Sequence, residues 1–230
     1  MTDPKPPTRA PLSRPRILKA ALRLIDERGL DALSMRSLGA ELGVEAMSLY
    51  RHVPSKAALL DGVVELMLAE VATDPLPAGL PWRGLLADVA RRYRSLARRH
   101  PGAFVLLVEH PERGYVAGRD ATVGVLTALE AAGFTPDDAI RAMRTLMRFV
   151  IGFALAERAE DRAGEDAGMA AVRLAEAGYR PVAALVGRLG PGHDEDLFDF
   201  GLRAVVEGLA LAARPTPPPG ERAPAAGPRR

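Results

Sequence analysis

The chain has 230 residues, of which 48% are hydrophobic and 26% are charged, so it is long enough for one large or two small globular domains. It contains no cysteine, which excludes disulfides, thiolate metal sites and cysteine nucleophiles. Aromatic residues make up only 5%, and the apolar positions are mostly Leu, Ala, Val and Met, which favour helices over sheets. The composition therefore predicts an all-α protein.

Neither end of the sequence suggests export or membrane insertion. The opening "MTDPKPPTRAPLSRP" lacks the apolar run of a signal peptide, and no later stretch reaches the roughly 20 uncharged residues of a membrane span. We therefore expect a cytoplasmic protein. The net charge is only +2, but residues 1–60 carry ten Lys and Arg against six Asp and Glu. This local excess is compatible with a polyanionic partner and with ordinary solvated surface charge.

The first helices of the chain can be placed from their caps and glycines. Apolar residues at helical spacing predict a helix from Arg16 to Arg28, and a second helix is expected between the cap Ser34 and the terminating Gly43. Gly39, inside this second helix, costs about 1 kcal/mol of helix propensity relative to Ala. A close approach of another helix at Gly39 is therefore predicted.

A very short helix follows, because Gly43 and Pro54 leave room for only about two turns. An isolated helix of that length is marginal in water, so Val44, Leu49 and Val53 are expected to anchor one side of it. A short helix joined to its predecessor by a glycine turn fits the helix-turn-helix arrangement, in which the second helix enters the DNA major groove. A plain three-helix bundle fits the same spacing.

The rest of the chain reads as a second helical unit. A linking helix, capped by Ser55 and ending near Ala72, precedes a proline-rich connector at 73–81, which marks the domain boundary. This divides the chain into a DNA-binding unit over 14–72 and a helical body over 82–213, with disordered tails at 1–13 and 214–230. Within the body, helices are predicted at 82–100, 103–109, 115–132, 136–160, 168–189 in one or two pieces, and 194–213.

Residues 17–68, "ILKAALRLIDERGLDALSMRSLGAELGVEAMSLYRHVPSKAALLDGVVELML", resemble the DNA-binding domain of the TetR (tetracycline-repressor) family of transcriptional regulators. The segments "HPGAF", "LEAAGFTPDDAIRAM" and "FDFGLRAVVEGL" resemble the ligand-binding half of its tetracycline-repressor class. The resemblance implies an N-terminal helix-turn-helix domain and a larger C-terminal helical domain for ligand binding and dimerisation. It also implies a repressor, without a cofactor, that a small molecule releases from a palindromic operator on double-stranded DNA.

By position, the resemblance assigns DNA contacts to eight residues of the second helix, the short helix and the linking helix: Arg36, Ala46, Met47, Ser48, Tyr50, Arg51, His52 and Lys56. Arg36 can bond two acceptors of guanine or meet only a phosphate. Tyr50 can be half buried with its hydroxyl on a phosphate, and Lys56 is expected to meet one. Ala46 and Met47 offer only apolar contact with thymine methyls, so the operator sequence cannot be inferred.

The resemblance also implies a small-molecule pocket between helices of the body, although core packing explains most of the same residues. Its candidate lining residues are Trp82, Val89, Tyr93, Leu106, Val125, Ile140, Met143 and Met147. Where the tetracycline-repressor class has polar and metal-binding residues, this chain has Ala72, Val89, Leu106 and Val125, which cannot ligate a metal. We therefore expect a metal-free site for a hydrophobic effector. Tyr93, and Arg94 or His110, would be its polar contacts.

The helices at 136–157 and 194–213 are apolar nearly all round, so part of their surface should face a partner. A homodimer through a four-helix bundle of these helices fits the pattern and the resemblance. An enzyme is disfavoured, because Ser95 is the only serine after residue 60 and lies in no GxSxG motif, and no HExxH occurs. A helical adaptor that binds protein partners remains the alternative from another class.

Overall fold

The computed structural model describes residues 11–72, 80–188 and 194–212, and within these ranges every regular element is a helix. The all-α prediction is confirmed for this part of the chain, while most of the expected tails and of the connector lies outside it. None of the described helices is long and apolar enough to cross a membrane. The elements are α1 (Arg14–Arg28), the 3-10 turn η1 (Leu30–Ala32), α2 (Met35–Leu42), α3 (Ala46–Leu49), α4 (Lys56–Ala72), α5 (Trp82–Arg99), α6 (Val105–Glu109), α7 (Pro111–Ala117), α8 (Arg119–Ala131), α9 (Pro136–Glu176), α10 (Arg180–Val186) and α11 (Asp194–Ala212).

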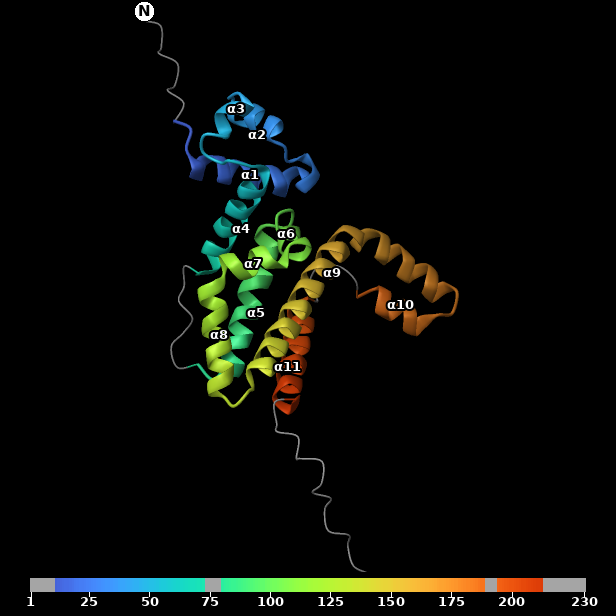
Figure 1. The fold of residues 1–230 in the computed structure, drawn as a ribbon. Coiled ribbons are helices and arrows are strands. Elements are labelled where there is room, and N and C mark those ends of the chain that lie inside the picture. Colours follow the sequence, from blue (N-terminus) through green and yellow to red (C-terminus); the bar gives the residue numbers. More distant parts are fainter. Residues whose placement is uncertain (1–10, 73–79, 189–193, 213–230) are drawn as a thin grey trace, which may run out of the picture.

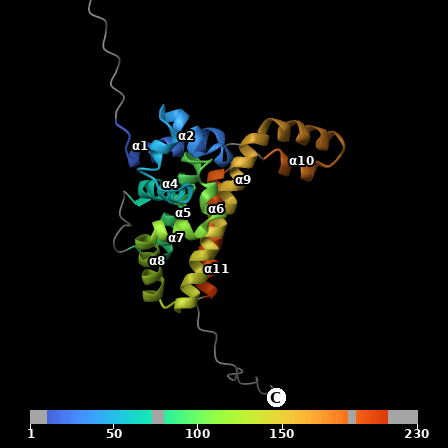
Figure 2. The same ribbon diagram turned by 45° about the horizontal axis from the view of Figure 1, so that its top comes forward.

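The molecule has a small unit at one end, formed by α1, α2 and α3, and a larger helical body that contains α5, α8, α9 and α11 (Figure 1). Helix α4 runs from the small unit to the body. The end of α9 turns away from the body and, with α10, forms an arm that also projects in the second view (Figure 2). The two ends of α4 therefore belong to different parts of the fold.

The caps predicted for α2 are confirmed. Ser34 Oγ accepts a hydrogen bond from the Ser37 backbone N at 3.0 Å, and Ser37 Oγ accepts one from the Ser34 backbone N at 2.9 Å. Gly43 ends α2 in the left-handed region, at φ 68°, which glycine adopts without strain. The close approach at Gly39 is also confirmed, since a Cβ there would lie 2.8 Å from the Val44 carbonyl oxygen. These features fix the turn between α2 and α3.

A first hydrophobic core fills the small unit and reaches into the body. Its buried side chains come from α1 to α4, as expected, but also from α5, α6 and the turn between them. Phe104, Leu106 and Leu107 are among the latter and are at most 5% exposed. The connector at 73–81 is therefore not a boundary between cores, because residues after it complete the packing of residues before it.

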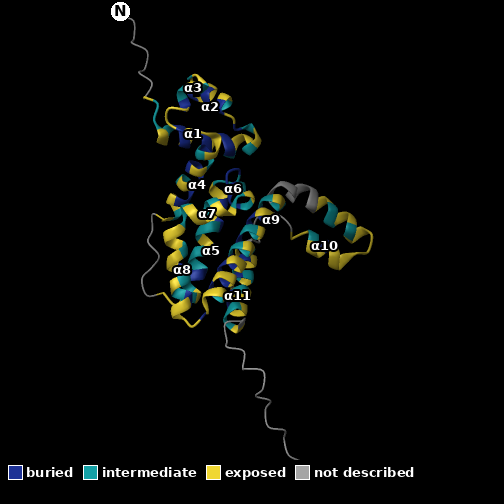
Figure 3. Ribbon diagram, viewed as in Figure 1, coloured by how far each residue is buried: buried dark blue, intermediate teal, exposed yellow. Residues whose placement is uncertain are grey.

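A second hydrophobic core holds the body together. It contains buried side chains of α5, α8, α9 and α11 and is richer in aromatic rings, which pack edge-on or stacked. Trp82 meets Phe134 at 5.0 Å between ring centres, and Phe149 meets Phe198 at 5.5 Å. Figure 3 shows dark blue, buried residues along the facing sides of these helices, whereas the arm of α9 and α10 is mostly exposed.

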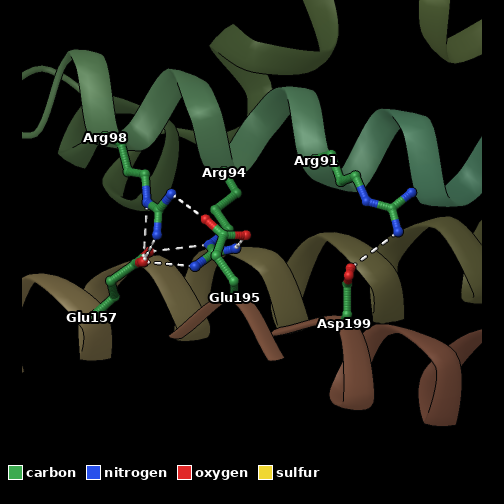
Figure 4. Close-up of polar contacts among 6 residues, drawn as sticks. All are labelled: Arg91, Arg94, Arg98, Glu157, Glu195 and Asp199. Carbon is green, nitrogen blue, oxygen red and sulfur yellow. Dashed lines mark hydrogen bonds and ion pairs between the residues drawn. The ribbon is translucent and has the colours of Figure 1, made fainter. Parts of the chain in front are cut away.

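Ion pairs tie α5 to α9 and α11 beside the second core, and the pair of Arg94 with Glu157 is buried (Figure 4). Arg94 is 4% exposed; its Nη2 lies 2.7 Å from Glu157 Oε1 and its Nη1 lies 2.9 Å from Glu195 Oε2. Arg98 binds the same two carboxylates. The Arg94 guanidinium also lies 4.5 Å from the centre of the Phe198 ring, close enough for a cation–π contact. We name these two arginines and two glutamates the charge cluster.

Several predicted helix bounds need correction. One helix was expected at 115–132, but α7 begins at Pro111 and α8 begins after Gly118, because proline suits the first helical position and glycine separates the two segments. The helix expected to end near residue 160 continues as α9 to Glu176, and the helix expected at 168–189 is the end of α9 followed by α10. A glycine inside a helix lowers the helix propensity of that segment but does not end the helix, so α9 can continue past residue 160.

Candidate DNA-reading surface and ligand cavity

The short helix α3 forms a small exposed platform on the small unit. Leu49 and Val53 are at most 1% exposed and anchor the platform in the first core, as predicted, and Val44 packs against that core. Backbone hydrogen bonds from His52 N and Val53 N to Leu49 O, both 2.9 Å, continue the turn beyond α3. The side chains between these anchors are therefore held in fixed directions.

The structure brings the eight predicted DNA-contacting residues onto this end of the molecule, with different exposures. Arg36, Met47, Tyr50, Arg51, His52 and Lys56 are exposed, whereas Ala46 and Ser48 are half-buried. Among the residues whose burial the structure describes, Met47 is the most exposed large apolar residue, at 75%. Ala46 packs against the first core, which leaves little of its methyl group for a base contact. Exposed cationic side chains beside a narrow helix suit phosphates and guanine edges.

Lys56 stands at the first position of α4, where Ser55 caps the helix as predicted. The Ser55 Oγ accepts a hydrogen bond from the Ala58 backbone N at 3.0 Å. One turn further, Gly62 touches α1 so closely that a Cβ would lie 2.6 Å from a methyl carbon of Leu18. The N-terminal half of α4 is thus part of the small unit's packing.

The junction between the small unit and the body contains a histidine that links α1 to α4. His100 Nδ1 lies 2.8 Å from Asp26 Oδ2 of α1, and Nε2 lies 3.1 Å from Glu70 Oε1 of α4. The neighbouring Gly102 leaves no room for a side chain, since a Cβ would lie 2.3 Å from the Ile25 carbonyl oxygen. This contact fixes α1 against the turn that follows α5.

A cavity of about 540 Å³ lies at the seam of the two cores. The C-terminal half of α4 forms one wall with Leu68, Ala69, Val71 and Ala72. Helices α5, α7, α8 and α9 supply most of the others. A largely apolar cavity of this size suits a small organic molecule.

Five of the eight predicted lining residues do line this cavity: Val89, Tyr93, Val125, Met143 and Met147. Three do not, which corrects the prediction. Trp82 packs on Phe134, Leu106 is completely buried in the first core, and Ile140 is 44% exposed on another face of α9. On α6 it is Leu107 that lines the cavity. Adjacent helical residues point about 100° apart, so an error of one position moves a side chain off the wall.

The expected polar contacts also need correction. Arg94 is engaged in the charge cluster, and the His110 Nδ1 lies 3.5 Å from a Glu112 carboxylate oxygen, so neither lines the cavity. Polar lining comes instead from Tyr93 and from residues that sequence reasoning missed: Glu65, Arg92, Tyr115, Asp120 and Thr122. In the described parts of the chain, no three His, Asp or Glu side chains gather in a way that could hold a metal ion.

Tyr93 differs from the other polar lining residues because it packs against both cores. Burial, and secondarily the neighbouring Tyr115, raise the pKa of the Tyr93 phenol to about 12. The hydroxyl group therefore stays protonated at neutral pH and acts as a hydrogen-bond donor.

Comparison with known proteins agrees with this geometry. Residues 17–63 match the family described as "Bacterial regulatory proteins, tetR family", and residues 75–212 match "Tetracyclin repressor-like, C-terminal domain". The HTH-type transcriptional repressor DrrR1 of Streptomyces coeruleorubidus is 34% identical over 223 residues, which cover 89% of this chain and 81% of that protein.

Two solved structures illustrate the two surfaces. ActR of Streptomyces coelicolor in complex with actinorhodin superposes with a TM-score of 0.67 at 28% identity, covering 89% of this chain and all of that chain. BioQ with its double-stranded DNA operator superposes with a TM-score of 0.63 at 26% identity, covering 87% of this chain and 99% of that chain. With both halves matched and a repressor of similar sequence across most of its length, this chain belongs to the TetR family of transcriptional regulators and is a ligand-responsive, DNA-binding repressor.

Proposed function

We propose that this repressor binds a palindromic operator as a homodimer and is released when an apolar small molecule fills the cavity. Residues 14–72 form the DNA-binding unit, and residues 82–213 form the ligand-binding and dimerisation body. In this arrangement two α3 helices occupy successive major grooves, about 34–36 Å apart. The relatives are transcriptional regulators, which supports a role without catalysis.

The exposed platform of α3 carries this proposal. Its apolar side is sealed by Leu49 and Val53, so the remaining side chains can meet DNA without disturbing the fold. Arg36 lies on α2 beside the platform and Lys56 begins α4, so guanidinium and ammonium groups flank it. A guanidinium can bond two acceptors of guanine, whereas an ammonium group acts as a point charge for phosphate.

The proposed dimer surface is a stripe along α11. Leu197, Phe200, Gly208 and Leu211 are spaced by three, eight and three residues, lie on one side of the helix and are exposed. Gly152 and Leu155 of α9 are exposed as well, and a Cβ on Gly152 or Gly208 would meet nothing within 4 Å. A contiguous apolar stripe with open glycines suits close packing against the same stripe of a second copy.

Fewer side chains of α9 are exposed, and so available for the proposed dimer contact, than the sequence indicated. Met143, Leu146 and Val150 are at most 9% exposed within one chain. Gly201 lets α11 approach α9 closely within one chain, because a Cβ there would lie 2.7 Å from the Phe149 ring. The stripe of α11 is thus the larger part of the proposed contact.

Helix α4 offers a route from the cavity to the DNA. Its C-terminal half lines the cavity, and its N-terminal half packs on α1 through Gly62. From α7, another wall of the cavity, Arg113 hydrogen-bonds to the Asp61 side chain and to the Ala57 carbonyl oxygen of α4. A ligand that moves α7 or the end of α4 would therefore tilt the DNA-binding unit and change the separation of the two α3 helices in a dimer.

Operator binding can be tested by gel shift on DNA from upstream of the chain's own gene, with the variants Arg36→Ala and Lys56→Ala. Arg36→Ala should cost about 1–3 kcal/mol and relax discrimination at one base pair, whereas Lys56→Ala should weaken all sequences alike. Equal, sequence-independent losses would show that Arg36 only positions the protein. Absence of any specific site would favour the adaptor interpretation.

Release can be tested by calorimetry with each compound that a thermal-shift screen identifies. A ligand that lowers operator affinity must itself bind more weakly to the operator complex, by the same factor. Equal affinity for the free protein and for its operator complex would contradict the proposed coupling.

A further inference from the structure

The Tyr93 hydroxyl is an unused hydrogen-bond donor at the seam of the two cores. Within the described parts of the chain it has no hydrogen-bond partner, although its ring packs against both cores. A Cβ built on Gly118 would lie 3.6 Å from the Tyr93 oxygen, 3.6 Å from a Leu68 methyl carbon and 3.1 Å from the Gly114 carbonyl oxygen, which already accepts a hydrogen bond from the Gly118 backbone N. Gly118 and Leu68 both line the cavity, so the hydroxyl faces the space that a ligand would fill.

Two of the charged groups on the cavity wall, Arg92 and Glu65, are already engaged, and the third lies in solvent at the rim. Arg92 donates from Nε to Asp88 Oδ2 at 2.7 Å and from Nη1 to the Val71 carbonyl oxygen at 3.0 Å. Glu65 pairs with Arg14 at 3.1 Å. Asp120 is exposed at the rim, beside Arg119.

A charged ligand would have to lose its hydration shell without gaining a free partner of opposite charge, which is unfavourable. An uncharged ligand avoids that cost. A buried neutral phenol without a hydrogen-bond partner leaves one donor unsatisfied, and a ligand with an acceptor group removes that penalty.

We propose that the effector is an uncharged, mainly apolar molecule with a carbonyl group, and that Tyr93 donates a hydrogen bond to that carbonyl oxygen. The inference rests on the proposed function of the cavity as the effector site. It adds the class of ligand and the residue that selects it. Because the pKa of Tyr93 is about 12, the donor is present throughout the physiological pH range.

The probe pair for this proposal is 9-fluorenone and fluorene, which share one ring skeleton and differ by the carbonyl group. Equilibrium dialysis of the full chain would give the ratio of the two dissociation constants. In the Tyr93→Phe variant, the preference for fluorenone should fall about threefold to tenfold relative to the unmodified chain, the range expected for one hydrogen bond. Tyr179→Phe, which removes a phenol from the exposed start of α10, should leave the ratio unchanged.

A second measurement needs no variant. The carbonyl stretch of fluorenone should move to lower frequency when fluorenone binds the unmodified chain, because a hydrogen bond weakens the C=O bond. An unchanged stretch, an unchanged ratio in Tyr93→Phe, or no binding of either probe would overturn the proposal. Operator binding is measured separately by gel shift, so loss of DNA binding would count against the proposed function and not against the choice of ligand.

Discussion

The two hydrophobic cores differ in how completely one chain closes them. The first core is almost wholly aliphatic, and Ile17, Leu38, Leu49 and Leu59 within it are fully buried. The second core is rich in aromatic rings, and the opposite side of its helix α11 exposes large apolar side chains such as Phe200, which is 65% exposed. The apolar core side chains of the DNA-reading unit are therefore buried within a single chain, whereas the body exposes an apolar surface that a second copy would cover.

The largest expected effect is on the charge cluster, which fixes the second core. Glu157→Ala should lower the free energy of unfolding by about 3–5 kcal/mol, because it leaves the buried Arg94 guanidinium with one partner fewer. Chemical denaturation at fixed protein concentration measures this change. Asp199→Ala is the matched control: Asp199 also pairs with an arginine of α5, Arg91, but at the surface, so the loss should be at most about 1 kcal/mol. Equal losses would contradict the assigned difference in burial.

Truncation of the first core should also be costly, because that core is closed. Leu49→Ala, at the centre of the α3 platform, is expected to cost about 2–5 kcal/mol and to abolish operator binding. Met47→Ala, two residues away and 75% exposed, should change stability by less than about 0.5 kcal/mol. The comparison needs only thermal or chemical unfolding curves. A small effect of Leu49→Ala would show that the platform is held by something other than its buried leucine.

A charge introduced on α11 tests whether the exposed apolar side of this helix is the dimer surface. Gly208→Glu should weaken the proposed dimer by about thirtyfold, equivalent to about 2 kcal/mol, because the carboxylate would lack a partner in a close contact. Analytical ultracentrifugation over a concentration series gives the dissociation constant. Gly124→Glu places the same charge on exposed α8, where a Cβ would also meet nothing within 4 Å, and should leave the dimer intact. A Gly208→Glu protein that dimerises normally would rule out this face.

The smallest expected effect concerns the stability of the folded state at acidic pH. Burial alone would raise the pKa of Glu157, but hydrogen bonds and charges from Arg94 and Arg98 outweigh it and hold the pKa below the ordinary 4.5. The Arg98 hydrogen bond likewise lowers the pKa of Glu195. Carboxylates with lowered pKa values stabilise the folded state above about pH 4.5, and this contribution is lost as the pH falls through the folded-state pKa.

The contribution of these two carboxylates to stability should therefore stay level from pH 7 to about 5 and decline below 4.5. Because the Glu195 side chain is 71% exposed, Glu195→Gln should cost at most about 1 kcal/mol at pH 7 and should make the decline shallower. Unfolding curves at successive pH values measure both effects. An unaltered acid decline in this variant would mean that other carboxylates control it.

Helices with local stop and start signals could be predicted from the sequence. Ser34 and Gly43 act on backbone groups within a few residues, and each occupies the cap position expected of it. The length of α9 could not be predicted in the same way. Whether a helix continues past residues of low helix propensity depends on the elements that it packs against. The last part of α9 packs against α10, which comes later in the chain.

The candidate site likewise combines residues that local sequence patterns predict with residues whose position depends on distant packing. The eight residues assigned to DNA follow one local pattern and lie together at one end, although their contacts with DNA stay a prediction. The cavity depends on the rotation of separate helices, so Val89 and Tyr93 face it while Leu106 does not. The charge cluster joins residues about 60 and 100 positions apart, from Arg94 to Glu157 and to Glu195. No local pattern marks such pairs.

The position of the single tryptophan has a practical consequence for spectroscopy. Trp82 packs edge-on to Phe134 in the second core, with the Arg83 guanidinium 4.6 Å from its ring centre. Its fluorescence should therefore follow the body alone, whereas far-ultraviolet circular dichroism follows the helices of both cores. Because Phe104 and Leu107, which come after the connector, complete the first core, the two signals should change together on denaturation as a single transition.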